Sequence, residues 1–223
     1  MKKIIFWDWT GTLADESRLD KAFCRSIEEA ISKKKNIPFQ EAENAFNDYL
    51  KSLENTWEWH DYVRHGQHFG LDWAQLQERH LDKLRLLPDT EKILRFAKEK
   101  DYKNILATNA VRKVIILRLE YTGLTPHFDS IIASDDVQAL KSEGKHFRHG
   151  LKILNGSAPL SFSIGNNPVQ DIIPAKRLHL KTILCEFGQN LTHYHSPHIL
   201  GNYSETATPD YRIRNLTEVK NLI

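Results

Sequence analysis

The sequence places polar side chains directly after apolar runs, where they could carry out phosphate and cation chemistry. Asp8 follows the apolar run at residues 4–7, Thr108 follows a second run, a turn that leads to Lys141 follows a third, and the segment 166–171 follows a fourth strand candidate. Carboxylate and amide oxygens can hold a hard cation, whereas a hydroxyl and an ammonium group can hold an anion. These residue types together predict a site for a phosphate group and a metal ion.

The elements that must bring these residues together alternate between strand and helix. From residue 88 onward, short apolar runs alternate with amphipathic segments, a pattern typical of a parallel sheet with right-handed crossovers. The carboxyl ends of parallel strands share one edge of a sheet, and that edge holds the ligand in open α/β folds. The predicted strands are residues 2–7, 104–107, 130–133, 161–164, 182–185 and 211–213.

A different pattern fills residues 15–87, where apolar residues recur at helical spacing only. One of the predicted helices begins after Ile37, with Pro38 in its first turn. We therefore predict an α/β fold. Residues 1–14 and 88–223 form a Rossmann-like core with a doubly wound parallel sheet, and residues 15–87 form an inserted, all-helical cap.

The polar residues belong to four short motifs that occur in a fixed order along the chain. The motifs are Asp8-Trp9-Thr10-Gly11-Thr12-Leu13, then Thr108-Asn109, then Lys141 after the turn at residues 134–140, and finally Gly165-Asn166-Asn167-Pro168-Val169-Gln170-Asp171. In order and spacing they resemble the motifs of the haloacid dehalogenase (HAD) superfamily, and the helical insert resembles its C1-type cap. The resemblance extends over nearly the whole chain, and it depends on all four motifs rather than on any one.

The resemblance implies nucleophilic catalysis of phosphoryl transfer. Asp8 is expected to attack phosphorus and form an aspartyl-phosphate, which water then hydrolyses. Thr108 and Lys141 are expected to neutralise and orient the phosphoryl oxygens, with Thr12 and Asn109 as further phosphate-binding residues.

The resemblance also implies a Mg²⁺ cofactor and exposes three departures from the family pattern, of which Ser142 in place of a proline after the lysine matters least. The expected ligands are the Asp8 carboxylate, the backbone carbonyl of Thr10, Asn166 and Asp171. Thr10 replaces the catalytic aspartate that normally protonates the leaving group and activates water, a role worth roughly 10²–10⁴-fold in rate. Asn166 replaces a metal-facing aspartate, which removes one negative charge and should weaken Mg²⁺ binding.

Three functions follow from these motifs, and the sequence leaves all of them open. The first is a Mg²⁺-dependent phosphatase of low turnover that acts on a small phosphorylated metabolite. The second is a catalytically degenerate relative that binds phosphate or regulates without turnover, as Thr10 and Asn166 together suggest. The third, ranked below these, is a 2-haloacid dehalogenase. Against it, Thr10 occupies the position of a tyrosine, and no arginine falls near residue 39.

The composition excludes other classes of partner. The 223 residues carry a formal net charge of only +2, so we expect neither nucleic acid nor a membrane surface to bind. No apolar stretch is long enough to span a bilayer. Cys24 and Cys185 lie far apart, so two free buried thiols in a reducing cytoplasm are predicted. The oligomeric state, monomer or homodimer, stays open.

Aromatic and histidine residues gather in two further places. In the insert they are either a substrate-selecting patch that faces Asp8 or, as we favour, cap core with a solvated histidine face. Those residues are Trp57, Trp59, His60, Tyr62, His65 and His68. A second group, made of His193, His195 and His198, is predicted to be a solvated loop because no acid or cysteine with ligand spacing accompanies it.

Overall fold

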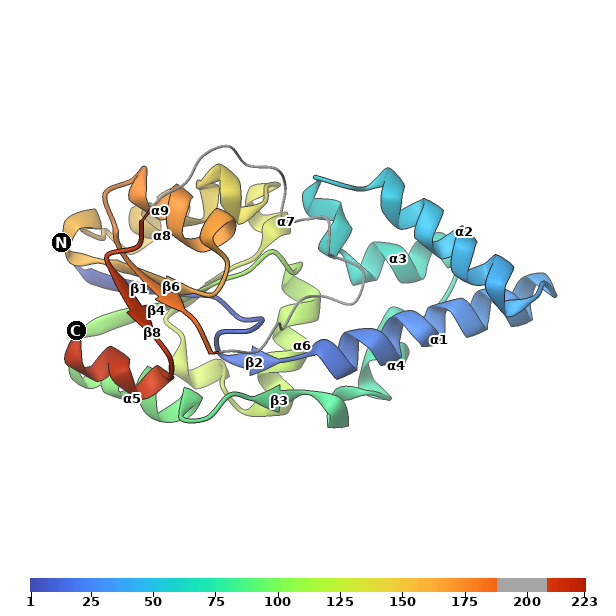
Figure 1. Ribbon diagram of the computed structural model, residues 1–223, viewed down its shortest axis with the longest axis horizontal. Helices are drawn as coiled ribbons and strands as arrows, with labels where there is room; N and C mark the ends of the chain where they lie inside the picture. Colours follow the sequence, from blue (N-terminus) through green and yellow to red (C-terminus); the bar gives the residue numbers. More distant parts are fainter. Residues whose placement is uncertain (188–207) are drawn as a thin grey trace.

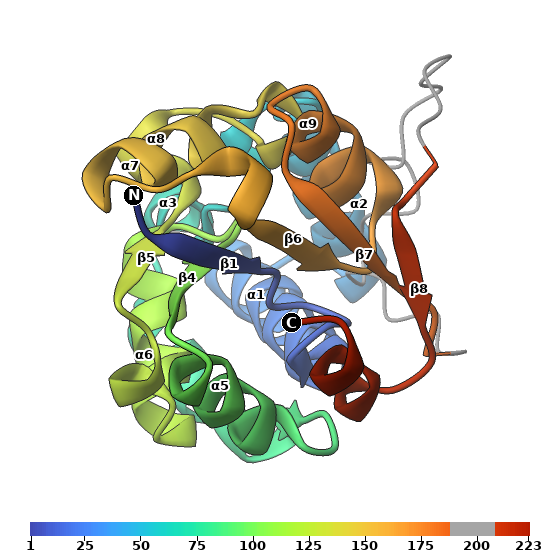
Figure 2. The same cartoon turned by 90° about the vertical axis from the view of Figure 1, so that its left-hand side faces the viewer.

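A parallel sheet forms the centre of the computed structural model, which describes residues 1–187 and 208–223. Within these residues the strand order is β5-β4-β1-β6-β7-β8, and every neighbouring pair runs parallel (Figure 2). The strands are β1 Lys3–Trp7, β4 Tyr102–Ala107, β5 Ser130–Ile132, β6 Phe162–Gly165, β7 Lys181–Cys185 and β8 Tyr211–Ile213. All of the predicted strands are therefore present, with ends that differ by at most two residues.

Helices cover both faces of the sheet, which confirms the doubly wound architecture (Figure 2). Alternate residues of β1 point to opposite faces: Ile5 and Trp7 join one apolar cluster, whereas Ile4 and Phe6 join the other. On the first face lie α5 Thr90–Glu99, α6 Arg112–Thr122 and η7 Leu216–Asn221, and on the second α7 Ser134–Val137, α8 Lys145–Ile153 and α9 Ile173–Lys176. Single-turn segments complete the core: η3 Thr125–His127, η4 Lys141–Glu143, η5 Ala158–Leu160 and η6 Pro168–Ile172.

The segment inserted after the first strand is helical and projects to one side of the sheet (Figure 1). It has an apolar core of its own, which also takes in Val111 and Val114 at the start of α6. The insertion is thus packed against the core rather than merely tethered to it. Its elements are α1 Ser17–Lys35, α2 Phe39–Ser52, η1 Trp57–His60, α3 Tyr62–Phe69, α4 Trp73–Glu78 and η2 Leu81–Lys83.

A short antiparallel ribbon closes the base of the insertion, a feature that the sequence did not reveal. Strand β2, Ala14–Asp15, pairs with β3, Arg85–Leu86. Two residues are too few for an alternating pattern to be recognised. The ribbon lies beside both points at which the sequence divides core from cap.

Several local predictions can be checked against the structure. The second cap helix begins at Phe39, with Pro38 as its extended N-cap rather than in its first turn. This small correction arises because Pro38 has a ψ of 148°, outside the helical range. Cys24 and Cys185 are buried and unpaired, as predicted. Among the described residues, no helix is long and apolar enough to cross a membrane.

The aromatic cluster of the insert is mainly cap core. Trp59 and Tyr62 are buried, and so are His60 and His65, so the prediction of a solvated histidine face is wrong for these two. His65 is held inside because its Nε2 lies 2.9 Å from the backbone oxygen of Trp59. His68 alone of the cluster's histidines is exposed. The second histidine group, at residues 193–198, lies outside the described residues.

Candidate active site

The central strands deliver the predicted site residues to one edge of the sheet. Strand β1 lies between β4 and β6, with Trp7 opposite both Leu106 and Ile164. The residues that follow these strand ends, Thr108, Asp8 and Asn166, therefore belong to three adjacent strands. The edge of the sheet brings together side chains that are more than fifty residues apart in the chain.

Both carboxylate oxygens of Asp8 have partners. Oδ2 accepts a hydrogen bond of 2.9 Å from the hydroxyl of Thr12, and Oδ1 contacts the ammonium group of Lys141. The loop at residues 8–12 folds tightly because Gly11 has a φ of +77°, and a Cβ there would lie 2.2 Å from the Asn166 amide. The turn thus wraps the Asp8 carboxylate and presses against the end of β6.

Lys141 links Asp8 to Asp171. Its Nζ lies 2.6 Å from Oδ1 of Asp171 and also contacts Asp8, and its side chain is only 3% exposed. Burial alone would lower the pKa of Lys141, but the two carboxylates outweigh burial and raise it. The lysine is therefore a fixed positive charge between two acids that come from different strand ends.

The backbone around Lys141 is held by two side-chain amides. Asn109 Oδ1 accepts from the backbone N–H of Lys141 at 2.8 Å, and Asn109 Nδ2 donates to Gln170 Oε1 at 3.2 Å. The same oxygen of Gln170 accepts from the N–H of Ser142 at 2.9 Å. Asn109, predicted to bind phosphate, thus positions the lysine segment in this structure. Gln170 was missed, although its place inside the fourth motif could have marked it.

Asp171 is fixed from three directions in addition to Lys141. Its Oδ2 accepts from the N–H of Asn167 at 3.0 Å, and its backbone oxygen accepts from the Ser163 hydroxyl at 2.8 Å. A Cβ on Gly165 would lie 2.2 Å from the Asp171 carboxyl carbon, so only glycine leaves room for this carboxylate. Burial raises the pKa of Asp171, the charge of Lys141 opposes that rise, and Asp8 adds to it.

Thr108 is held by a buried histidine. The Nε2 atom of His146 lies 3.1 Å from the backbone oxygen of Thr108, and burial lowers the pKa of His146 to about 3. The imidazole is therefore neutral, and Nε2 must carry the hydrogen because a carbonyl oxygen only accepts. The Thr108 hydroxyl accepts from the N–H of Ala110 at 3.1 Å and retains its own hydrogen to donate.

Thr10 belongs to a buried charged network that sequence reasoning missed. Its hydroxyl donates to Glu16 Oε1 at 2.6 Å, and Glu16 Oε2 accepts from Trp9 Nε1 at 2.7 Å. Arg118 donates to the same Glu16 oxygen at 2.5 Å and to Asp20 at 3.2 Å. An arginine inside the apolar run at residues 114–119 was the available signal, because such a residue must find acidic partners.

The residues predicted to hold a cation offer only oxygen donors, which suits Mg²⁺. The carboxyl groups of Asp8 and Asp171 face a single ammonium group, so two acids and one cation meet at the edge of the sheet. Asn166 can add an amide oxygen and Thr10 a backbone carbonyl. Acidic ligands are few here: among the described residues, no group of three or more His, Cys, Asp and Glu side chains could hold a metal. The donor set fits one hard cation.

The doubly wound sheet, its carboxylate–ammonium–carboxylate edge and the helical insertion define a class of α/β hydrolases built around a strand-end aspartate. Comparison with protein families identifies the class. The model for haloacid dehalogenase-like hydrolases matches residues 2–179, and the chain belongs to this family.

Individual relatives include two enzymes named glyceraldehyde 3-phosphate phosphatase. The protein from Pyrococcus furiosus is 29% identical over 199 residues, which is 84% of this chain and 82% of the relative. The protein from Methanocaldococcus jannaschii is 25% identical over 100% of this chain and 97% of its own length. A crystal structure of a HAD phosphatase from Thermococcus onnurineus superposes with a TM-score of 0.83, at 26% identity, over 99% of this chain and 97% of that one.

Proposed function

We propose that this protein is a Mg²⁺-dependent phosphatase of low turnover that acts on a small phosphorylated metabolite. One observation carries the proposal: Asp8 lies at the carboxyl end of β1 with its carboxylate held by the Thr12 hydroxyl and the Lys141 ammonium group. A carboxylate so oriented is a nucleophile placed beside a cation that can receive phosphate. The phosphatase names of the relatives support the same reaction.

The proposed reaction has two displacements at phosphorus. In the first, an Asp8 oxygen forms a bond to phosphorus, the bond to the leaving oxygen breaks, and the departing alkoxide or phenolate takes a proton from solvent. In the second, water attacks the aspartyl-phosphate, the bond between phosphorus and Asp8 breaks, and phosphate leaves while the carboxylate is regenerated. The water gives up one proton, so the two steps together balance as hydrolysis.

Two side chains are suited to the charge that develops on the phosphoryl oxygens. Lys141 supplies a buried positive charge, and Thr108 supplies a hydroxyl hydrogen from the neighbouring strand end. Both are fixed before substrate arrives, Lys141 through Asn109 and Thr108 through His146. Such preorganisation removes the cost of reorienting dipoles during the reaction.

Asp8, Asp171, Asn166 and the Thr10 carbonyl are the groups that would hold Mg²⁺. The bound cation would neutralise phosphate charge and polarise phosphoryl oxygens. Asp171 is prepared for this role because Asn167 and Gly165 fix its carboxylate toward the sheet edge. Asn166 contributes no charge, so we expect the metal affinity to be modest.

The low turnover follows from Thr10. The threonine hydroxyl cannot act as a general acid or base near neutral pH, and a placed acid–base group is worth roughly 10²–10⁴-fold. A cytoplasmic location and the choice between monomer and homodimer are further predictions from the sequence.

The test is hydrolysis of 4-nitrophenyl phosphate with and without Mg²⁺, comparing the wild type with Asp8→Asn. We expect slow, Mg²⁺-dependent release of nitrophenol that Asp8→Asn reduces to background. Asp82→Asn is the matched control, because Asp82 is an exposed aspartate of the insertion whose side chain is 72% accessible. Hydrolysis that persists in Asp8→Asn, or that needs no metal, would contradict the proposal.

A phosphoprotein that persists is the second candidate function, and Thr10 is the observation that favours it. If the second displacement is very slow, Asp8 keeps the phosphoryl group and the protein acts as a phosphate-holding switch. Intact-mass measurement after incubation with an aryl phosphate separates the two functions. One added phosphoryl group on the wild type, absent from Asp8→Asn and not followed by phosphate release, would favour the switch.

A further inference from the structure

The hydrogen bond between Thr10 and Glu16 has a defined polarity. A carboxylate only accepts, so the 2.6 Å contact must use the hydroxyl hydrogen of Thr10. Thr10 lies two residues after Asp8, in the loop whose Thr12 hydroxyl binds the Asp8 carboxylate and whose Gly11 touches Asn166. The hydrogen of Thr10 is therefore committed to Glu16, within the loop that carries Asp8, and the hydroxyl oxygen is left as an acceptor.

Glu16 is fixed in place, so its carboxylate keeps accepting the hydrogen bond from Thr10. Its second oxygen accepts from Trp9 at 2.7 Å and from Arg118 at 2.5 Å, and its side chain is 1% exposed. Arg118, also 1% exposed, reaches on to Asp20 of α1 and to Gln77 of α4. The carboxylate is thus fixed by groups from the first loop and from the core helix α6, and Arg118 is in turn held by two helices of the insertion.

We infer that Glu16 is a positioning residue of the phosphatase reaction, which holds Thr10 as a hydrogen-bond acceptor and prevents it from donating to the leaving group. The inference rests on the proposed phosphatase function. Thr10 can then orient the attacking water but cannot assist departure of an alcohol. The protein should prefer phosphates whose leaving group departs as a stable anion, such as aryl phosphates, over simple alkyl phosphates.

Glu16→Gln reverses this polarity. Trp9 and Arg118 both donate to one oxygen of residue 16, so the single oxygen of a glutamine must take that place. Its amide nitrogen then faces Thr10 and donates to it, which frees the hydroxyl hydrogen to point into the site. The shape of the side chain is kept, the direction of this hydrogen bond reverses, and the negative charge beside Arg118 is lost.

The experiment measures kcat/KM for 4-nitrophenyl phosphate and for glycerol phosphate, with the full chain and Mg²⁺ throughout. The aryl-to-alkyl ratio reports how much departure of the leaving group depends on a hydrogen bond to its oxygen. We expect Glu16→Gln to lower this ratio about tenfold, since a donor aimed at the leaving oxygen assists only the alkyl substrate. Glu29→Gln, an exposed change on α1, is the matched control and should leave the ratio within about twofold.

A double-mutant cycle tests whether the change in the aryl-to-alkyl ratio depends on the Thr10 hydroxyl. Thr10→Val removes the hydroxyl, so Glu16→Gln in that background should no longer change the ratio. Glu16→Asp covers the case in which Glu16→Gln does not fold. It keeps the charge beside Arg118 but is one methylene too short for the 2.6 Å contact with Thr10, so the ratio should fall in the same direction.

The outcomes separate this inference from the function on which it rests. A wild type that releases no phosphate from either substrate overturns both. A wild type that is active while Glu16→Gln, or Glu16→Asp in its place, keeps the wild-type ratio overturns the role of Glu16 and leaves the phosphatase intact. A fall in the ratio that persists unchanged in the Thr10→Val background overturns it as well, because the effect would not pass through the hydroxyl.

Discussion

The ammonium group of Lys141 lies 2.6 Å from Oδ1 of Asp171 and contacts Asp8 at the same time, so one side chain joins the end of β1 to η6, the segment that follows β6. Lys141 comes from η4, outside the sheet, and is placed by the Asn109 amide. Because the lysine and Asp171 are both nearly inaccessible, neither charge can be solvated in place of its partner. Stability and, in the proposed reaction, chemistry therefore depend on the same contact.

Lys141→Met should destabilise the fold as well as abolish activity. The change leaves two buried carboxylates without their cation, and removing one partner of a buried pair costs about 3–5 kcal/mol. Urea unfolding measures this loss in the free energy of unfolding. Lys145→Met removes an exposed lysine paired with Glu143, and should cost no more than about 1 kcal/mol. If both variants lost the same free energy of unfolding, the buried ion pair would stabilise the fold no more than an exposed one.

Gly165→Ala should remove activity by displacing Asp171. A Cβ at this position would lie 2.2 Å from the Asp171 carboxyl carbon, so the carboxylate must move away from Lys141. A shift of about 1 Å at a reacting group costs about 100-fold in rate, and kcat for an aryl phosphate measures it.

Gly123→Ala is the matched control for that change. Gly123 has a φ of +72°, so alanine is strained there by roughly 1–2 kcal/mol, but nothing lies within 4 Å of the new Cβ. This variant should lose some stability and keep its kcat. A Gly165→Ala protein with wild-type kcat would show that the position of Asp171 does not matter for the reaction.

The strands and the main site were predictable because both follow from local patterns. Apolar runs that end in polar residues located Asp8, Thr108 and Asn166, and parallel pairing then required these ends to meet. Glu16 and Arg118 were not predictable in the same way. They are 102 positions apart and meet only because α6 packs against the base of the insertion. No periodic pattern in the local sequence indicates such a long-range contact.

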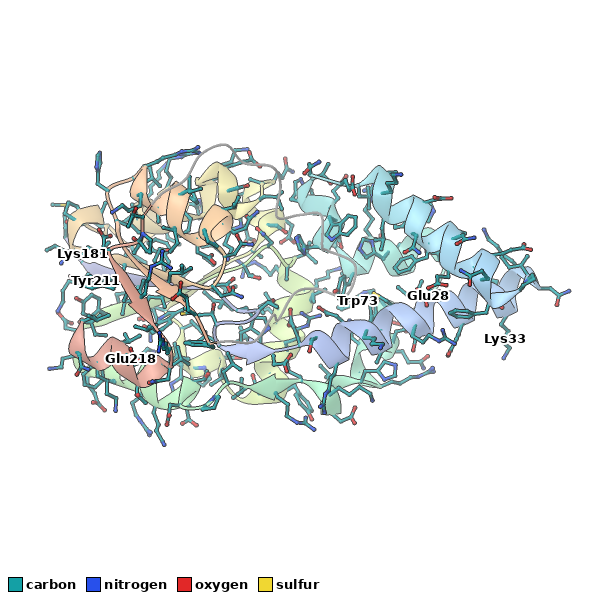
Figure 3. The ribbon with its side chains drawn as sticks, viewed as in Figure 1. Glu28, Lys33, Trp73, Lys181, Tyr211 and Glu218 are labelled. Carbon is teal, nitrogen blue, oxygen red and sulfur yellow. The ribbon has the colours of Figure 1, made fainter. Side chains whose placement is uncertain are left out.

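The acidic residue Glu28 should make the stability of the protein depend on pH. Glu28 lies on α1 (Figure 3), is only 1% exposed, and burial raises its pKa to about 7, with the charge of Glu43 adding to the rise. The folded state holds this proton more tightly than the unfolded chain, whose ordinary value is 4.5. The free energy of unfolding should therefore fall as pH rises from about 4.5 to 7, by at most roughly 3 kcal/mol.

Glu28→Gln tests that dependence because a neutral amide has no charge to bury. The variant should be more stable than the wild type at pH 8 and close to it at pH 4.5, as measured by urea unfolding at both values. Glu29→Gln, at the neighbouring exposed position, should follow the wild-type curve. If the difference in the free energy of unfolding between the wild type and Glu28→Gln were the same at pH 4.5 and pH 8, Glu28 would not bind a proton more tightly in the folded state.

Asn166→Asp should strengthen Mg²⁺ binding and make stability depend on the metal. A third carboxylate at the edge of the sheet adds attraction for a divalent cation, so half-maximal activity should need about tenfold less Mg²⁺. With the metal removed by EDTA, repulsion from Asp8 and Asp171 should lower the midpoint of urea unfolding below that of the wild type.

The neighbouring Asn167→Asp is the control for the metal experiment. Asn167 uses its side-chain oxygen to accept from the N–H groups of Val169 and Gln170, and aspartate can do the same. This variant should keep the wild-type Mg²⁺ requirement. If both variants shifted that requirement equally, the effect would be one of general charge and not of a ligand at residue 166.

Restoring an aspartate at residue 10 should succeed only together with a change at Glu16. From the sequence alone, Thr10→Asp is expected to raise hydrolysis because it supplies the missing acid–base group. The structure alters that expectation, since the Thr10 oxygen lies 2.6 Å from Glu16, and two carboxylates at this separation repel one another. Thr10→Asp/Glu16→Gln replaces the repulsion with a hydrogen bond from the amide, and its kcat should exceed that of Thr10→Asp by about tenfold. Stopped-flow release of nitrophenol and of phosphate measures both steps. A single Thr10→Asp variant as fast as the double variant would mean that the new aspartate turns away from Glu16 and acts without it.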